Sequence, residues 1–239
     1  MKFSIQLYGL RDMVKNRSEF PGLFPQLKAL GFGGVELWGV PEDPAAYRRA
    51  LDDAGLAATS AHFGLDDLRP ENLRKTLDAC KILGMPMMGI GGAAHGRPKD
   101  TEASCAVLKA AHEAAQREGV IVHYHNHADE FKPYKDGTRA IDSFMAACPL
   151  ELDTYWSFCA GVDNFAFITE HRDRLCAIHI KDGVGRKTKA LGEGRCDLAA
   201  VVRGAKAIGL GWLVLENDDP APDGLSDAAR SMAWLKANV

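Results

Sequence analysis

The chain alternates short β-like runs with longer helical patterns from one end to the other. The β-like runs cover residues 3–8, 34–38, 57–63, 86–90, 120–125, 150–154, 177–181 and 212–216. The helical patterns end near residues 29–31 in the first unit and then cover 45–54, 71–83, 102–116, 138–147, 164–172, 197–207 and 225–237. Strands that alternate with helices are typical of a parallel sheet.

The length of the chain favours closure of this sheet into a barrel. A barrel of eight such units usually takes roughly 250 residues, and the chain has 239. An open, doubly wound sheet would need a Gly-rich GxGxxG turn after its first strand, but residues 8–12 read YGLRD. No linker or low-complexity segment divides the chain. We therefore predict a single (β/α)8 TIM barrel domain over residues 1–239.

Charge and hydropathy exclude several classes of protein. Hydrophobic residues make up 46% of the chain, and 29 basic residues face 32 acidic ones, which argues against disorder and against a strongly basic nucleic-acid binder. The longest apolar stretch, 85–94, is far short of the roughly 20 residues that span a bilayer, and residues 1–11 contain no signal-peptide core. The six cysteines form no CxxC pair. We expect a cytoplasmic protein with reduced thiols and a small-molecule partner.

Polar residues gather at the predicted strand ends, where a TIM barrel builds its active site. They are Gln6, Tyr8, Glu36, His62, 123–127, Asp153, 179–182 and 216–219. Each alone is more commonly a helix cap or a hydrogen-bonded buried side chain than a ligand. The hypothesis of a functional site rests on the whole set.

Alternation along the strands predicts a metal site. His123 and His125 share one face of their strand, and His125 lies nearer the rim. Asp153, His179 and Glu216 each end a largely apolar strand, where an unpaired carboxylate is costly to bury and a divalent cation compensates that cost. We predict one cation bound by His125, Asp153, His179 and Glu216. Two imidazoles favour Zn²⁺, Mn²⁺ or Co²⁺ over Mg²⁺.

Seven segments also resemble one known family. They are SIQLYGLR (4–11), GVELW (34–38), YHNHADEF (124–131), LDTYW (152–156), HIKD (179–182), GEG (192–194) and END (216–218). Together they are similar to the sugar phosphate isomerase/epimerase family of xylose-isomerase-like TIM barrels, which includes inosose dehydratase and ketose epimerase relatives. The resemblance runs in the same order from the first strand to the last.

The resemblance implies a divalent metal held by strands five to eight, and proton transfer at a carbon next to a carbonyl. Many members carry Glu-Asn-His where this chain has His125-Asn126-His127, so His125 takes the ligand position and His127 that of a second, catalytic or substrate-binding imidazole. Asp153, His179 and Glu216 match the other three ligand positions. Trp156 stands where ketose epimerases place a substrate-facing histidine.

These assignments lead to an expected mechanism. Metal-polarised substrate loses a proton next to its carbonyl, with Glu216 and His127 sharing the base and acid roles and Lys181 and Glu130 fixing substrate oxygens. Glu36 and His62 are expected on the opposite wall, and Trp38 and Trp156 offer apolar faces to a sugar ring. Lys181 and Asp182 form an internal ion pair in an alternative interpretation.

Several alternatives stay open at this point. Related epimerases use two Glu carboxylates on opposite faces of the substrate, and one of that pair is an imidazole here. A dehydratase or lyase acting on a keto-sugar or inosose-like substrate is therefore the second hypothesis, and a non-catalytic sugar-binding barrel is the third. A metal-dependent endonuclease would need more metal ligands and a basic face. We expect a carbohydrate partner, no nucleic acid, no membrane contact and a possible homo-oligomer.

Overall fold

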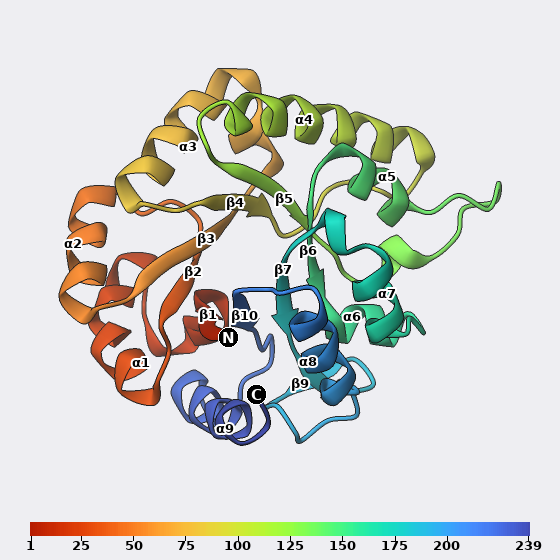
Figure 1. The fold of residues 1–239 in the computed structure, drawn as a ribbon. Helices are drawn as coiled ribbons and strands as arrows, with labels where there is room; N and C mark the ends of the chain where they lie inside the picture. The colour runs from red at the N-terminus through yellow and green to blue at the C-terminus, as the bar shows by residue number, and fades with distance from the viewer.

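The computed structural model describes residues 1–239 and contains a closed barrel of parallel strands inside a ring of helices (Figure 1). Around the barrel the strands follow the order β1, β10, β7, β6, β5, β4, β3 and β2. Their bounds are Lys2–Gln6 (β1), Gly34–Trp38 (β2), Ala57–Phe63 (β3), Met87–Ile90 (β4), Ile121–His125 (β5), Leu150–Asp153 (β6), Leu175–Ile180 (β7) and Trp212–Leu215 (β10). The predicted TIM barrel is confirmed.

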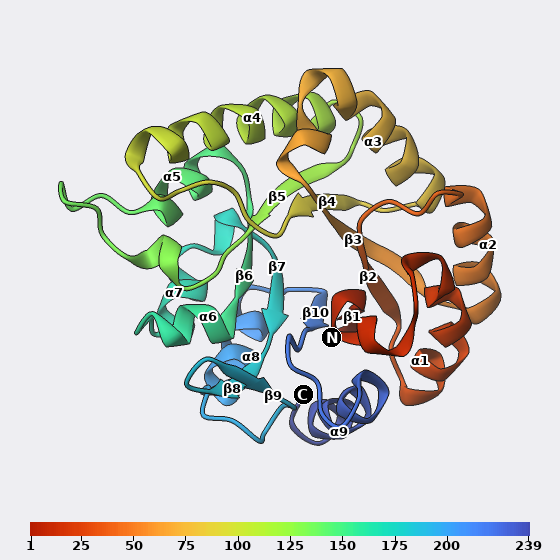
Figure 2. The ribbon, with the colours of Figure 1, turned by 180° about the vertical axis from the view of Figure 1, so that it is seen from behind.

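Nine α-helices lie outside the barrel (Figures 1 and 2). They are α1 (Phe24–Leu30), α2 (Pro44–Ala54), α3 (Pro70–Leu83), α4 (Pro98–Gln116), α5 (Ala140–Ala147), α6 (Thr154–Cys159), α7 (Asn164–Glu170), α8 (Leu198–Ala207) and α9 (Gly224–Asn238). Proline at the first position of α2, α3 and α4 needs no backbone N–H there. After α2 and α3, Gly55 and Gly84 adopt the left-handed conformation that ends the helix.

Two local predictions are wrong at the ends of strands. The first strand ends at Gln6 rather than Tyr8, because the Gln6 side chain accepts the Tyr8 N–H and starts a 3-10 helix over Leu7–Met13. Asp153 likewise ends β6 and caps α6, a helix that the sequence analysis did not predict. A two-stranded hairpin, β8 (Asp182–Val184) with β9 (Lys187–Lys189), was not predicted either (Figure 2).

Asp182 organises the long loop after β7. Its carboxylate accepts backbone N–H groups from Gly183, Gly192, Gly194 and Cys196 at 2.8–3.0 Å. Asp182 makes no ion pair with Lys181, so the alternative interpretation of these two neighbours is wrong. The two side chains serve different parts of the structure.

The hydrophobic core lies between the strands and the helices, whereas the barrel interior is polar near the carboxyl ends of the strands. On β6, Leu150 and Leu152 belong to the core, and the alternate residues Glu151 and Asp153 point into the barrel. Barrel interiors are usually filled by Val, Ile and Leu. Here they hold buried carboxylates and imidazoles, which need compensating partners.

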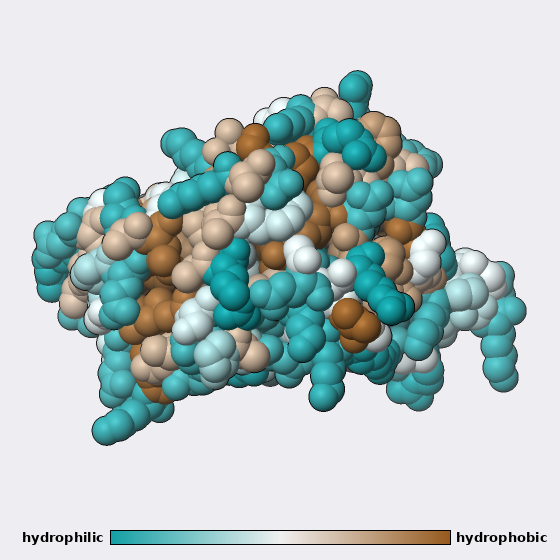
Figure 3. Space-filling model, turned by 90° about the horizontal axis from the view of Figure 1, so that it is seen from below, coloured by the Kyte–Doolittle hydropathy of each residue, from teal (hydrophilic) through white to brown (hydrophobic).

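The outer surface is largely hydrophilic. Figure 3 shows one side of the molecule, where hydrophobic residues appear in patches between hydrophilic ones. The large hydrophobic side chains that are exposed are Met1, Val40, Ile82, Phe158, Phe165 and Val184. None of the helices combines the length and the hydrophobicity that crossing a membrane requires.

Candidate metal centre

A cavity of about 770 Å³ opens at the carboxyl ends of the strands. Five predicted site residues line it: His62, His125, His127, Trp156 and Glu216. Tyr8 and Trp38 also line it and pack edge to face, with ring centroids 5.0 Å apart. The cavity therefore has an aromatic wall beside a group of titratable side chains.

The four predicted metal ligands lie together at the floor of this cavity. His125, Asp153, His179 and Glu216 each offer a ligand atom, and these atoms lie within 4.8 Å of one another. The four residues come from the ends of β5, β6, β7 and β10, which are neighbours in the barrel. The sequence prediction thus selected side chains that the fold brings into one cluster.

Asp153 shows why this cluster suits a cation. One carboxylate oxygen, Oδ1, accepts the N–H groups of Tyr155 and Trp156 at 2.9 and 2.8 Å and so caps α6. The other, Oδ2, is buried without a hydrogen bond, 3.2 Å from Lys181 Nζ and 3.9 Å from His125 Nε2. A buried carboxylate oxygen without a hydrogen bond is costly, and a cation bound to it would remove that cost. The residues present fit a divalent ion.

Glu36 orients the His179 imidazole. Its Oε2 atom lies 2.6 Å from His179 Nε2 and also accepts a hydrogen bond from Gln6 at 2.7 Å. His179 Nδ1 is left facing Glu216 Oε2 at 3.0 Å. Carboxylates behind a histidine fix the ring nitrogen that faces a metal. Glu36 is fully buried and does not line the cavity, so it lies beneath the floor rather than on the expected wall.

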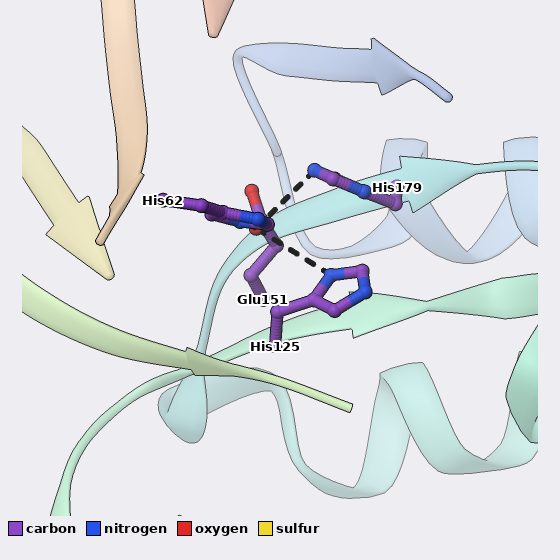
Figure 4. Close-up of side chains that lie close together, drawn as sticks. All are labelled: His62, His125, Glu151 and His179. Atoms are coloured by element: carbon purple, nitrogen blue, oxygen red, sulfur yellow. Dashed lines mark hydrogen bonds and ion pairs between the residues drawn. The ribbon is translucent and has the colours of Figure 1, made fainter. Parts of the chain in front are cut away.

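Glu151 is a member of the site that the sequence analysis missed. Its Oε2 atom lies 2.6 Å from His62 Nε2, 3.2 Å from His179 Nε2 and 3.7 Å from His125 Nδ1 (Figure 4). The spacing of two residues from Asp153 was the available signal, because it places both carboxylates on the inner face of β6. Glu151 thus connects three imidazoles from three other strands.

Opposite charges determine the protonation of His62 and His179. Burial favours the neutral ring of His62, but Glu36 and Glu151 outweigh it and raise the pKa of His62. Burial also favours the neutral ring of His179, but Glu151, Glu36 and Glu216 outweigh it and raise the pKa of His179 well above its usual value. In the absence of a cation, protons on these rings compensate the buried carboxylates.

Lys181 is buried among three carboxylates. Its Nζ atom lies 2.6 Å from Asp218, 2.9 Å from Glu216 and 3.2 Å from Asp153. Burial opposes the charge, but these carboxylates raise the pKa of Lys181, so the ammonium stays protonated. Lys181 does not line the cavity. It lies behind Glu216, where its charge stabilises the carboxylate form.

Glu130 supports His127 from below. The fully buried Glu130 carboxylate accepts the Tyr124 hydroxyl at 2.8 Å and the His127 backbone N–H at 3.0 Å. The His127 ring is half exposed, and its centroid lies 5.2 Å from that of His125 and 6.0 Å from that of Trp156. His127 therefore faces the cavity while Glu130 fixes the segment that carries it.

Replacing Glu130 by Gln is expected to lower stability in a pH-dependent way. Burial raises the pKa of Glu130, but hydrogen bonds from His127 and Tyr124 outweigh it and lower the pKa from 4.5 to about 2. The lowered pKa of Glu130 in the folded protein contributes about 3 kcal/mol to the free energy of unfolding above pH 4.5. This contribution is lost as the pH falls from 4.5 towards 2. Urea unfolding at pH 7, 4 and 3 should show the gap between wild type and variant narrowing.

Exposed Glu42 provides a control, since Glu42→Gln should leave the pH profile unchanged. The same Glu130 variant should keep its metal content while turnover falls roughly 10–100-fold, the usual effect of losing a supporting hydrogen bond. A constant stability gap across this pH range would contradict the role given to Glu130.

Comparisons with known proteins agree with this architecture. A family model described as "Xylose isomerase-like TIM barrel" matches residues 24–238. A sugar phosphate isomerase/epimerase from Parabacteroides distasonis is 21% identical, with a TM-score of 0.85 over 99% of this chain and 96% of that chain. No curated protein sequence matches the chain.

Two further solved structures carry different activities in their names. A 3-keto-D-glucoside 4-epimerase from E. coli is 20% identical, with a TM-score of 0.78 over 99% of both chains. A probable 3-DHS dehydratase from Bacillus anthracis is 14% identical, with a TM-score of 0.77 over 99% of both chains. At these identities the likeness establishes a shared fold, and chemistry has to be argued from the site.

Proposed function

The chain belongs to the xylose isomerase-like TIM barrel family, and on that basis we propose that it is a metal-dependent sugar isomerase or epimerase. The observation that carries the proposal is the cluster of His125, Asp153, His179 and Glu216 at the floor of an open cavity. The reaction proposed is removal and return of a proton at a carbon next to a carbonyl.

The metal part of the proposal rests on the donor set. A bound divalent cation supplies Lewis acidity, which lowers the pKa of a C–H bond next to a substrate carbonyl. His125, Asp153, His179 and Glu216 would hold it, and two imidazoles favour Zn²⁺, Mn²⁺ or Co²⁺. Glu36 and Glu151 support the ligand imidazoles from beneath.

Glu216 is assigned as the base and His127 as the acid. Burial raises the pKa of Glu216, but Lys181 and His179 lower it well below its usual value, so the carboxylate is ionised. Burial lowers the pKa of His127, but Glu130 outweighs it and raises the pKa, which favours the imidazolium. Both side chains line the cavity. One group thus accepts a proton while the other donates one.

A carbohydrate suits the walls of the cavity. Tyr8, Trp38 and Trp156 offer aromatic faces, while His62 and Gln6 offer polar atoms beside them. Small-molecule sites typically combine apolar walls with a few polar groups, within about 300–1,000 Å³. At about 770 Å³ the cavity has room for a monosaccharide, with or without a phosphate.

One observation favours a dehydratase as a second candidate. Glu36 and Glu151 are fully buried beneath the floor, so Glu216 shares the cavity with imidazoles rather than with a second glutamate. A carboxylate and an imidazole have different pKa values and suit the removal of a proton and the protonation of a leaving hydroxyl. Elimination of water from a keto-sugar needs one group of each kind.

Solvent exchange tests the proposal. In deuterated water, with a divalent metal present, the enzyme should place deuterium next to the carbonyl of at least one compound in a panel. The panel contains keto- and aldo-sugars, inosose-like polyols and their phosphates, and mass spectrometry also detects loss of water. Exchange should disappear on chelation and in Glu216→Gln.

Glu42→Gln is the matched control, because it makes the same chemical change at an exposed position outside the cavity. This variant should exchange at the wild-type rate. If several compounds bind with the metal present and none exchanges or loses water, the catalytic proposal fails. A non-catalytic sugar-binding barrel would then take its place.

A further inference from the structure

Three buried side chains beneath the candidate metal centre each keep one polar atom without a hydrogen bond. The atoms are Glu36 Oε1, His123 Nδ1 and Glu151 Oε1, and all three side chains are fully buried. Polar atoms left unpaired in a protein interior are costly and rare. His123 Nδ1 also lies 3.8 Å from Glu151 Oε2, beyond hydrogen-bond distance but close enough for both atoms to bind one ion.

The three residues converge inside the barrel from β2, β5 and β6. They form a group of their own, with one ligand atom from each lying within 4.8 Å of the others. This group contains neither Asp153 nor Glu216. It shares no residue with the predicted centre, although Glu36 contacts His179 and Glu151 contacts both His179 and His125.

The other polar atom of each residue is already engaged. Glu36 Oε2 bonds to Gln6 and His179, and Glu151 Oε2 bonds to His62. His123 Nε2 lies 2.7 Å from the Ser60 hydroxyl. When Nε2 donates its hydrogen to that hydroxyl, Nδ1 keeps a free lone pair, as a ligand needs.

The neighbouring strand makes room for the His123 ring. A Cβ atom added at Gly89 on β4 would lie 2.3 Å from both Nδ1 and Cε1 of His123. No other residue can stand at Gly89 without displacing the imidazole. The absence of a side chain there holds His123 in the interior beside Glu36 and Glu151.

Charge balance points to a second cation. Lys181 pairs with Asp153, Glu216 and Asp218, whereas every ion pair of Glu36 and Glu151 is with an imidazole. A divalent cation beside these two carboxylates would supply the positive charge that only protons on the neighbouring imidazoles supply without it.

We propose that Glu36, His123 and Glu151 hold a second divalent cation, deeper in the barrel than the predicted one. One imidazole with two carboxylates suits Zn²⁺ or Mn²⁺. Because none of the three ligands is exposed, this ion fastens β2, β5 and β6 together and does not bind substrate. The inference does not depend on the proposed sugar reaction.

Native mass spectrometry of Mn²⁺-loaded protein, desalted on a gel filtration column, counts the ions directly. We expect two in the wild type and one in His123→Leu, which has no ligand nitrogen. Glu151→Gln, nearly identical in shape, should also hold one and serves if the leucine variant does not fold. Ser60→Ala is the matched control, because it removes a partner of His123 and leaves all three ligands, so two ions should remain.

Asp153→Ala separates the two sites. This variant should lose only the ion at the candidate metal centre. Mn²⁺ should therefore still raise its midpoint of thermal unfolding. The double variant Asp153→Ala/His123→Leu should show no such rise. A single wild-type ion that is lost in Asp153→Ala and kept in His123→Leu would overturn the deeper site and leave the proposed function intact. A single wild-type ion that is kept in Asp153→Ala and lost in His123→Leu would support the deeper site and contradict the candidate metal centre. Two ions in both His123→Leu and Glu151→Gln, or none in either, would also overturn the inference.

Discussion

Replacing Asp153 by Ala is expected to weaken binding of the divalent cation at the candidate metal centre by more than 100-fold. Asp153 Oδ2 is the buried carboxylate oxygen without a hydrogen bond in the cluster, and its loss removes one of two anionic ligands. Changes to residues that merely support ligands already cost about 10–100-fold, so removal of a ligand should cost more. Dialysis without chelator followed by metal analysis should show one ion fewer per chain. His179→Ala should behave in the same way.

Asp163→Ala is the control for this prediction. Asp163 caps α7 through its carboxylate as Asp153 caps α6, but it is exposed and lies outside the metal cluster. Both variants lose a helix cap, at about 0.5–2 kcal/mol each, and only Asp153→Ala should lose metal. Wild-type metal content in both Asp153→Ala and His179→Ala would place the ion elsewhere.

Replacing Lys181 by Met is expected to destabilise the metal-free protein by about 3–5 kcal/mol, because it leaves buried carboxylates without their cation. Asp153, Glu216 and Asp218 lie within 3.2 Å of the ammonium and would face one another without it. Methionine preserves most of the side-chain volume, so the loss reports on charge. Urea unfolding at pH 7 in the presence of a chelator measures the difference.

Addition of a divalent cation should restore part of the stability of Lys181→Met, since the ion supplies positive charge to the same carboxylates. Lys187→Met, on the exposed strand β9, should unfold like the wild type. If Lys181→Met loses no more stability than Lys187→Met, the ammonium does not compensate these carboxylates.

The grouping of His125, Asp153, His179 and Glu216 could be predicted because it depends on local patterns. Strand alternation and the position of Asp153, His179 and Glu216 at strand ends are visible in the chain itself, and a closed parallel barrel gathers such residues at one rim. Glu151 was equally visible, since its spacing from Asp153 puts both on one face. The pattern does not single it out, because Leu150 and Leu152 mark the strand as apolar and Asp153 alone marks its polar end.

Other features depend on contacts across the barrel that no local pattern contains. Glu36 meets His179 143 residues away, and this contact decides that Glu36 lies under the floor rather than on the wall. Lys181 and Asp182 are neighbours in the chain, but they serve different elements. Lys181 meets carboxylates and Asp182 meets backbone N–H groups, and these partners depend on how the loop after β7 folds back.

That loop has a consequence for motion. The Asp182 carboxylate collects four backbone N–H groups spread over residues 183–196, so the segment opens only when these hydrogen bonds break together. Opening of this kind belongs to local unfolding rather than to nanosecond loop fluctuation. Lys181, immediately before Asp182, is therefore fixed before any ligand arrives. Lys181 and the segment after it lose their conformational entropy during folding. Binding of a ligand therefore does not include that entropic cost.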